Sequence, residues 1–271
     1  MLKQAILIVL YNQYIENSHL IRNFINFDFK DVYVFDNSND INIYNANKDF
    51  CIKKFIKFHT KNYNVGLSIA YNLIIKNLIN LNYDWITIFD QDSEIDNNFF
   101  NELNLSIVKN PQVYVHIPIV KVLDNNSKSF ILSPKPLTKI KFNNFQIIKY
   151  KRKIVNSGIT INTNVFYKIG FFNESLFLDF IDHDFFDRFY KLYTNVSVFN
   201  SVLTQNFSGI TASSLSSSIT RYKIFLKDSK VFCLRFTFSP FIFLYLNFKR
   251  IIKLTVFYRS LKFIQIFLSN G

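Results

Sequence analysis

Glycine, proline and cysteine are all scarce in this chain of 271 residues, which contains five glycines, five prolines and two cysteines. So little glycine and proline excludes a collagen-like chain and a Pro/Gly-rich linker. Two cysteines, Cys51 and Cys233, cannot build a disulfide framework, and we expect a reducing compartment. Hydrophobic residues make up 49% of the chain and charged residues 19%. That composition excludes intrinsic disorder and provides for a sizeable core.

Long hydrophobic runs are also missing. The N-terminal run Ala5–Leu10 is short for the core of a secretory signal, and no small-residue cleavage site follows it. The longest apolar stretch, Phe236–Phe248, has 13 residues, whereas a transmembrane helix needs about 20. We therefore expect a soluble, cytoplasmic protein that can lie on a membrane surface.

Acidic residues are nearly absent from the C-terminal part of the sequence. Residues 219–271 contain ten Lys or Arg and one acid, Asp228, and so carry +9 of the total charge of +13. This asymmetry indicates an anionic partner, either a nucleic acid or a membrane surface. We divide the chain into a domain of residues 1–218 and a basic, aromatic extension of residues 219–271. The Ser-rich stretch Ser213–Ser218 marks the boundary.

Strand-like and helix-like segments alternate over the first 120 residues. Apolar runs at Ala5–Leu10, Asp31–Asp36 and Trp85–Phe89 are typical of buried parallel strands, and the spacing over Asn64–Leu81 predicts a helix. Ile52–Phe58 alternates apolar and polar residues, which predicts a further strand. This rhythm predicts an α/β fold with a mostly parallel sheet and helices on both faces. In such sheets, ligands bind beyond the carboxyl ends of the strands.

Carboxylates stand at two of these strand ends. Asp90-Gln91-Asp92-Ser93 follows one strand directly, and its two carboxylates can face a divalent cation together. Mg²⁺ or Mn²⁺ prefers a few carboxylate oxygens plus the phosphate oxygens of a substrate. Asp36-Asn37-Ser38 ends another strand, where a carboxylate can accept a hydrogen bond from a nucleoside. Both stretches also fit ordinary turns that close a strand.

Two further stretches combine polar residues with a helix start. In Asn64–Asn72, Gly66 permits close backbone approach, and the N–H groups at the helix start favour anions. In Leu178–Arg188, Asp182 stands at or before a helix start, where a general base can reach its substrate. Asp184 and Arg188 are four residues apart and can pair along that helix. Capped helices with a surface salt bridge are the structural alternative.

In order and spacing, these four stretches, together with Asn156–Gly158 and Ile169–Asp179, resemble family 2 glycosyltransferases of the GT-A fold. The likeness is to the bacterial rhamnosyltransferase branch in particular, and it covers roughly residues 5–230. It implies a GT-A, Rossmann-like domain with a nucleotide-sugar half at about residues 1–110 and an acceptor half at about 111–218. It also implies inverting transfer of a sugar, rhamnose from dTDP-rhamnose, to a hydroxyl of a growing surface polysaccharide such as capsule or O-antigen, or of a lipid-linked glycan.

The resemblance implies roles for individual residues. Asp36 would contact the base or ribose, and Asp92, with Asp90, would hold Mg²⁺ or Mn²⁺ at the diphosphate. Asp182 would be the catalytic base, with Asp179 as its main rival. The other residues implied are the donor-binding Asn64, Gly66, Ser157 and Gly158, and the supporting Asp184, Arg188 and Gln205.

One position departs from the family pattern. The family often has a metal-binding His after the base motif, and Gln205, in the stretch Gln205–Gly209, stands there instead. Glutamine is a weaker ligand for a transition metal, which bears on how tightly a metal binds.

Two other functions remain alternatives. The basic tail with its interleaved aromatics would suit single-stranded nucleic acid, with the α/β part as scaffold. The acidic strand ends would repel phosphates, however, so we expect no nucleic acid partner. A nucleotidyltransferase would share the fold, but the N-terminal region has no Gly-rich basic loop.

The tail itself allows two placements. It can dock the enzyme on the inner face of the plasma membrane through anionic lipid, or it can pack as a helical subdomain on the core. The two can coexist, with part of the tail packed and part facing lipid.

Overall fold

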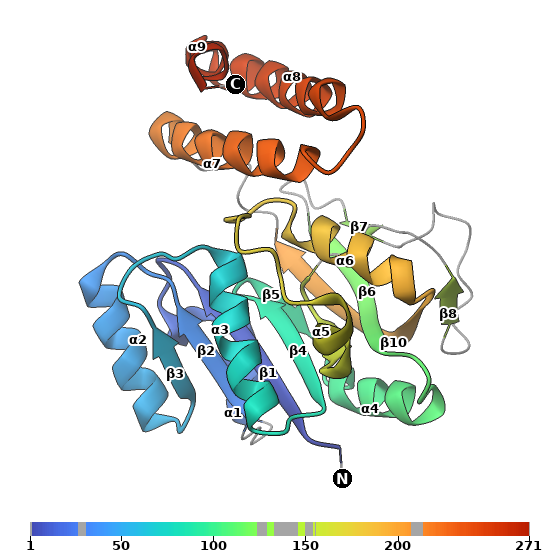
Figure 1. Cartoon of the computed structure of the whole chain (residues 1–271). Helices are drawn as coiled ribbons and strands as arrows, with labels where there is room; N and C mark the ends of the chain where they lie inside the picture. The colour runs from blue at the N-terminus through green and yellow to red at the C-terminus, as the bar shows by residue number, and fades with distance from the viewer. Residues whose placement is uncertain are drawn as a thin grey trace.

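The computed structural model describes residues 2–26, 31–123, 129–132, 146–149, 154, 156–206 and 214–270. Within these residues, ten strands form one mixed sheet with helices on both faces. Three further helices stack beyond one edge of this domain, at the end opposite the N-terminus (Figure 1). The chain thus has the α/β fold with a helical C-terminal extension that the sequence predicts.

The sheet has a parallel half and a mixed half. The parallel half has the order β3-β2-β1-β4, with bounds β1 (Gln4–Leu10), β2 (Val32–Asp36), β3 (Lys57–Thr60) and β4 (Trp85–Asp90). The mixed half continues as β9-β6-β10-β5, with bounds β9 (Ile159–Asn162), β6 (Val115–Leu123), β10 (Asn195–Asn206) and β5 (Ser93–Ile95). Two short strands extend it, with β7 (Ser129–Leu132) on β6 and β8 (Gln146–Lys149) on β10. In this half, the β6–β10 pair is parallel and its other pairings are antiparallel.

The helices follow the strands in alternation. In the sheet domain they are η1 (Ile15–Asn17), α1 (His19–Asn26), α2 (Ile41–Lys53), α3 (Leu67–Asn80), α4 (Phe99–Lys109), α5 (Asn164–Ile169) and α6 (Ile181–Leu192). The C-terminal helices are α7 (Leu215–Cys233), α8 (Ser239–Tyr258) and α9 (Lys262–Asn270).

Alternation along the buried strands builds a core on each face of the sheet. In β1, Leu7 and Val9 face the core under α3, α5 and α6, whereas Ile6, Ile8 and Leu10 face the core under α1, α2 and α4. Strand side chains alternate between faces, so a strand covered by helices on both sides is apolar throughout. This explains the continuous apolar runs in the sequence.

One predicted strand is wrong in its bounds. The alternating stretch Ile52–Phe58 begins inside α2, which runs to Lys53, and β3 starts only at Lys57. Asp40 caps α2 by accepting hydrogen bonds from the N–H groups of Asn42 and Ile43. Once capped at its start, α2 continues to Lys53. The short apolar-polar alternation of the sequence does not show where this helix ends and the strand begins.

The C-terminal helices form a unit with its own small core. Tyr222 of α7, Ile251 of α8 and Phe263 of α9 are buried together. The α7 helix starts at Leu215, with Ser214 as its cap, so the predicted boundary at residues 218/219 falls inside its first turns. It also packs on the sheet domain, where Phe232 stacks on Phe180 with ring centroids 4.7 Å apart.

A buried histidine lies between α4 and the sheet. The His116 Nε2–H donates to the Val113 carbonyl at 3.1 Å, and Nδ1 lies 2.7 Å from the Ser106 hydroxyl, which must therefore be the donor. The ring is fully buried, and burial lowers the pKa of His116 from 6.5 to about 4. The unfolded chain therefore binds a proton on this residue between these pH values, and the folded protein does not.

We predict that this histidine makes the protein less stable as the pH falls from 6.5 towards 4. At pH 5, linkage gives a loss of about 2 kcal/mol in the free energy of unfolding from this residue. The measurement is urea unfolding of the wild type and of His116→Gln at pH 7.5 and 5. The variant will be less stable at pH 7.5 but will lose about 2 kcal/mol less on acidification. An equal loss in both proteins contradicts the prediction.

Candidate functional site

The carboxyl ends of the central strands bring the predicted acidic residues to one edge of the sheet. In register, Leu10 of β1 is opposite Asp36 of β2, and Val9 is opposite Asp90 of β4. The two carboxylates therefore flank β1 at nearly the same level, as parallel strands require. In Figure 1 the C-terminal helical unit lies beyond this same edge.

Asp90 and Asp92 form a carboxylate pair without a cationic partner in the part of the chain that the structure describes. Burial raises the pKa of Asp90 to about 7, and the neighbouring charges of Asp92 and Asp182 act in the same direction. Burial also raises the pKa of Asp92. Two neighbouring, partly buried carboxylates of like charge favour proton uptake or a bound cation.

Gln205 joins this pair from another strand. The antiparallel pairing of β10 with β5 places Gln205 opposite Ser93. From there the Gln205 side chain reaches Asp90, and its Nε2 donates to Asp90 Oδ2 at 2.7 Å. Gln205 thus acts as a hydrogen-bond donor to a carboxylate. The rest of the stretch, Phe207–Gly209, lies outside the described residues.

This set of groups fits a hard divalent cation. Two carboxylates can ligate Mg²⁺ or Mn²⁺ if substrate phosphates and water supply the other oxygens. No cluster of three or more His, Cys, Asp or Glu side chains suited to a metal occurs among the described residues. The protein alone therefore offers a two-carboxylate site.

Asp36 is buried and already bonded to the protein. Its Oδ1 accepts the Ser38 N–H at 2.7 Å, which is the turn that closes the strand, and its Oδ2 accepts from Asn47 Nδ2 at 2.7 Å. Each oxygen keeps one further acceptor position. The predicted contact with a nucleoside would use those positions.

Two asparagine side chains tie the strand-end loops together: Asn64, which the sequence analysis assigned to donor binding, and Asn37, which it did not single out. Asn37 Oδ1 accepts the Val65 N–H at 3.0 Å, and its Nδ2 donates to the Gly66 carbonyl at 3.2 Å. Asn64 Oδ1 in turn accepts the Gly66 N–H at 2.9 Å. Asn37 follows Asp36 directly, so its place at a strand end was the available signal.

Gly66 permits a close approach by another segment of the same chain. Its φ is +85°, and a Cβ there would lie 2.7 Å from the Phe177 ring. The Leu67 N–H at the start of α3 donates to the Phe177 carbonyl at 2.7 Å. The sequence predicted a backbone open to a ligand, and the structure places the loop before α6 against it.

Ser157 and Gly158 support Asp90 from behind. The Ser157 hydroxyl accepts the Asp90 N–H at 3.3 Å and lies 2.5 Å from the Ser93 hydroxyl. Gly158 has φ +74°, and a Cβ there would contact Leu203 at 2.6 Å. Both residues are buried and pack the strand ends, which fixes the position of Asp90.

Asp182 lies in the first turn of α6, close enough to Asp90 for its charge to act on that carboxylate. Its Oδ1 accepts the His183 N–H at 2.8 Å. Burial raises the pKa of Asp182, while His183 opposes that shift and Asp179 adds to it. The charge of Asp182 also raises the pKa of Asp90, so the two groups share one site.

Tyr71 of α3 lies close enough to Asp90 and Asp182 for both charges to act on it, and the sequence analysis did not expect this. It is fully buried, and its hydroxyl makes no hydrogen bond of standard geometry within the described residues. Burial raises its pKa, and the charges of Asp90 and Asp182 add to that effect. A phenol close to two carboxylates is a donor available to either of them.

The other acids near α6 are held by arginines. Arg188 Nε donates to Asp184 Oδ2 at 3.0 Å, which confirms the predicted pair, and Arg235 Nη1 donates to Asp184 Oδ1 at 2.8 Å. Asp179 accepts two hydrogen bonds from Arg221, one of them at 2.8 Å to Oδ1. Arg221 and Arg235 come from α7 and its C-terminal end, too far along the chain for spacing to predict.

A carboxylate from α7 fixes the loop before α6. Asp228 is fully buried and accepts the N–H groups of Phe177, Leu178 and Asp179 at 2.9, 2.8 and 2.8 Å. The loop then continues through Phe180, which has the left-handed φ of 64°, into α6 and Asp182. The C-terminal extension is therefore part of what positions the site.

The sheet order and the flanking helices form a GT-A-like α/β fold. No family model matches the sequence, and no curated protein is significantly similar to it.

Solved structures do show the fold. The chain is similar to S. aureus TarS, with a TM-score of 0.56 and 15% identity over 86% of this chain and 39% of that one. For TarS 1–349 with UDP, the TM-score is 0.55 with 17% identity over 91% of this chain and 71% of the other. For TarS 1–349 with UDP-GlcNAc, it is 0.54 with 14% identity over 84% and 66%. The chain thus spans well under half of the longer TarS structure, and at these identities the likeness is one of fold.

We predict that Asp228→Asn lowers the free energy of unfolding by about 2–3 kcal/mol. The three backbone N–H groups that the carboxylate accepts would then share a single neutral amide oxygen. Amide hydrogen exchange at Phe177, Leu178 and Asp179 will become faster. Exchange at Leu67 will follow, because its acceptor is the Phe177 carbonyl. Lys227→Gln, an exposed neighbour on α7, is the control. Unchanged stability and exchange in Asp228→Asn contradict this role.

Proposed function

We propose that the protein is an inverting glycosyltransferase that moves a sugar from a nucleotide-sugar donor to an acceptor hydroxyl. The observation that carries the proposal is the convergence of three partly buried acids at one sheet edge. Asp90 and Asp92 form an uncompensated pair on the strand side, and Asp182 of α6 lies close to Asp90. The order of motifs, the GT-A-like fold and the TarS complexes with UDP and UDP-GlcNAc support the same function.

The carboxylate pair suits the donor side of this reaction. Departure of a nucleoside diphosphate builds up negative charge, which a divalent cation neutralises while it orients the phosphates. Asp92, with Asp90, would hold Mg²⁺ or Mn²⁺, and Asp36 would meet the nucleoside. Gln205 and Ser157 hold Asp90 in place for this task.

Asp182 suits the acceptor side as the general base. A base needs a free oxygen and a raised pKa, and burial gives Asp182 the second of these. Its rival Asp179 accepts from Arg221, and Arg250 lies 3.9 Å away, so its charge is compensated. No Lys or Arg pairs with Asp182 among the described residues, which favours it over Asp179. Asp184 is engaged by Arg188 and Arg235 and supports α6.

The proposal extends to the donor sugar and to the acceptor. The motif resemblance favours rhamnose from dTDP-rhamnose, whereas the named TarS complexes contain UDP and UDP-GlcNAc. The acceptor proposed is a hydroxyl on a growing surface polysaccharide or lipid-linked glycan.

A thermal-shift panel tests the donor class, because a ligand that binds the native state raises its melting temperature. The panel contains dTDP-rhamnose, UDP-GlcNAc, UDP and ATP, each with Mn²⁺ or with EDTA. A shift with a nucleotide sugar that is larger with Mn²⁺ supports the proposal. A flat response to every nucleotide sugar contradicts it.

We predict that Asp92→Ala abolishes the Mn²⁺-dependent part of nucleotide-sugar binding and reduces transfer to background, while the protein stays folded. The reason is that one of two carboxylates suited to the cation is lost. Glu94→Ala is the matched control, since it removes an exposed carboxylate two residues away. Transfer by Asp92→Ala at the wild-type rate shows that the pair has no such role.

We predict that Asp182→Asn lowers kcat by about 10²–10⁴-fold, the usual contribution of a general base. The amide is nearly isosteric but cannot take up the acceptor proton. Donor binding, measured by the same thermal shift, will remain within about threefold of wild type. Asp179→Asn tests the rival. If Asp179→Asn loses turnover and Asp182→Asn keeps it, the assignment is reversed.

A further inference from the structure

The ten cations of the C-terminal unit divide into two groups. Three arginines face inward and pair with acids of the sheet domain, Arg221 and Arg250 with Asp179, and Arg235 with Asp184 and Asp187. Seven cations are exposed: Lys223, Lys227, Lys230, Lys249, Lys253, Arg259 and Lys262. The sole acid in residues 214–270, Asp228, is fully buried. The outer surface of the described unit therefore carries seven positive charges and no exposed acid.

The same surface is strongly apolar. Along α8, large side chains repeat every three or four residues and remain exposed: Phe241 73%, Leu244 50%, Phe248 66%, Ile252 48% and Val256 72%. This spacing puts them on one side of the helix. We call these five residues the α8 stripe. Contiguous apolar surface of this kind marks an interaction site.

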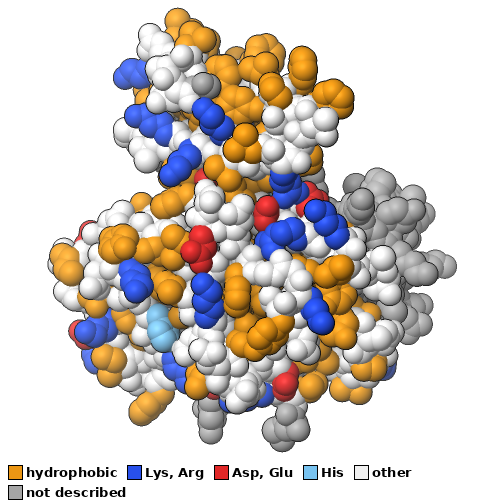
Figure 2. Space-filling model, in the orientation of Figure 1, with side chains coloured by type: hydrophobic (Ala, Val, Ile, Leu, Met, Phe, Trp, Pro, Cys, Tyr) orange, Lys and Arg blue, Asp and Glu red, His pale blue; other side chains and the backbone are white. Residues whose placement is uncertain are grey.

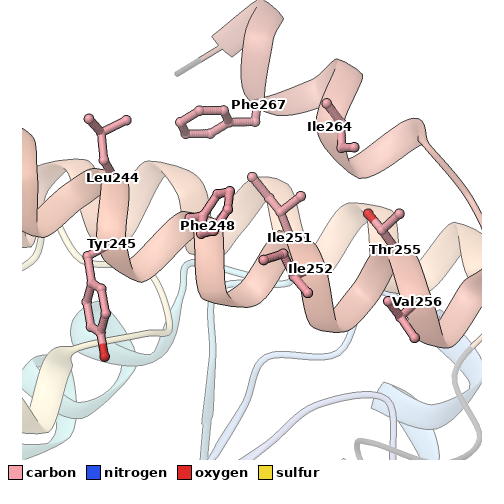
Figure 3. Close-up of a pocket in the computed structure, with 9 residues that line it drawn as sticks. All are labelled: Leu244, Tyr245, Phe248, Ile251, Ile252, Thr255, Val256, Ile264 and Phe267. Atoms are coloured by element: carbon pink, nitrogen blue, oxygen red, sulfur yellow. The ribbon is translucent and has the colours of Figure 1, made fainter.

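The α9 helix extends the apolar surface and closes a groove against α8. The groove has a volume of about 610 Å³ and is lined by apolar side chains and Thr255. Figure 3 shows Leu244 and Ile251 of α8 and Phe267 of α9 around this space. Figure 2 shows hydrophobic side chains gathered over the helical unit, with Lys and Arg side chains beside them.

The lysines lie where an interfacial helix needs them. Lys249 and Lys253 each follow a member of the α8 stripe, Phe248 and Ile252, and so stand about 100° around the helix from it. From there their ammonium groups reach headgroups while the stripe enters the acyl boundary. Within the described residues, no helix is long and apolar enough to cross a membrane.

The charge of this surface favours an anionic bilayer over a second copy of the chain as its partner. Two copies of the chain meeting through α8 and α9 would bring eight exposed cations together, Lys249, Lys253, Arg259 and Lys262 of each copy, with no exposed acid of the described unit to pair with them. Like charges across an interface disfavour it. An anionic bilayer supplies both a negative plane and an apolar layer beneath it.

We propose that α8 and α9 are the surface on which this protein docks to an anionic lipid bilayer, with the α8 stripe inserted at the acyl boundary. The inward arginines and Asp228 join the unit rigidly to the loop and helix that carry Asp182. The bilayer would then lie on the side of the molecule that holds the acidic site. If the proposed function holds, a lipid-linked acceptor lies on that same surface.

Flotation of the full chain with vesicles tests the docking without any need for activity. The vesicles are phosphatidylcholine alone and phosphatidylcholine with 30 mol% phosphatidylglycerol, a fraction of about one-third chosen to give an anionic surface. Binding should occur with the anionic vesicles and fall as salt rises. Equal binding to neutral vesicles, or binding to neither, overturns the proposal.

Two sets of variants separate charge from insertion. The triple variant Lys249→Gln, Lys253→Gln and Lys262→Gln should bind anionic vesicles about 100-fold more weakly, at about fivefold per cation removed. Arg250 is left intact because its guanidinium lies 4.0 Å over the Phe225 ring and near Asp179. Phe248→Ser with Val256→Ser should weaken binding at least tenfold, at ~25 cal/mol per Å² of apolar surface.

Matched changes on the sheet domain serve as controls. Phe55→Ser removes a side chain that is 90% exposed, and Lys48→Gln with Lys61→Gln removes two exposed cations. Neither should alter flotation, and circular dichroism will check that every variant is folded. If the stripe variants float like wild type, or if they instead abolish self-association seen by sedimentation, the surface contacts something other than lipid and the proposal is wrong.

Discussion

The carboxylate of Asp228 accepting three successive backbone N–H groups is the contact on which the site depends. The loop it holds contributes the Phe177 carbonyl to the start of α3 and leads directly into the first turn of α6. Buried N–H groups must find an acceptor, and a charged acceptor with no competing water holds them most firmly. A residue on the C-terminal extension therefore sets the distance between the strand-end acids and Asp182.

Electrostatics around α6 sorts the acidic residues into two classes. Asp179, Asp184 and Asp187 are compensated by arginines, two of them from α7 and its C-terminal end. Asp90, Asp92 and Asp182 are partly buried with no such partner in the described chain, and their pKa values are raised. Burial without compensation is unfavourable for the folded state unless a cation or proton is gained. Such groups mark functional sites because selection for stability alone would pair or remove them.

The C-terminal unit has two faces with different tasks. Its inner face uses arginines, Asp228 and the Phe180–Phe232 stack to complete the domain. Its outer face leaves lysines and the α8 stripe uncovered. Of the two placements expected from the sequence, packing on the core is therefore confirmed by the inner residues of these helices. Docking on a membrane stays a proposal, and it rests on the outer residues of the same helices.

The sequence by itself determined the α/β class, the strand ends at Asp36 and Asp90, and the Asp184–Arg188 pair, because these depend on local periodicity and on neighbours one helical turn apart. It assigned the last residues of α2 to a strand, because an alternating stretch as short as Ile52–Phe58 does not show where a preceding helix ends. Only the tertiary structure decided that Gly66 faces Phe177, that Tyr71 lies close to the acids, and that Asp228, Arg221 and Arg235 support α6. Those contacts join residues tens of positions apart, and neither spacing nor composition carries that information until the chain has folded.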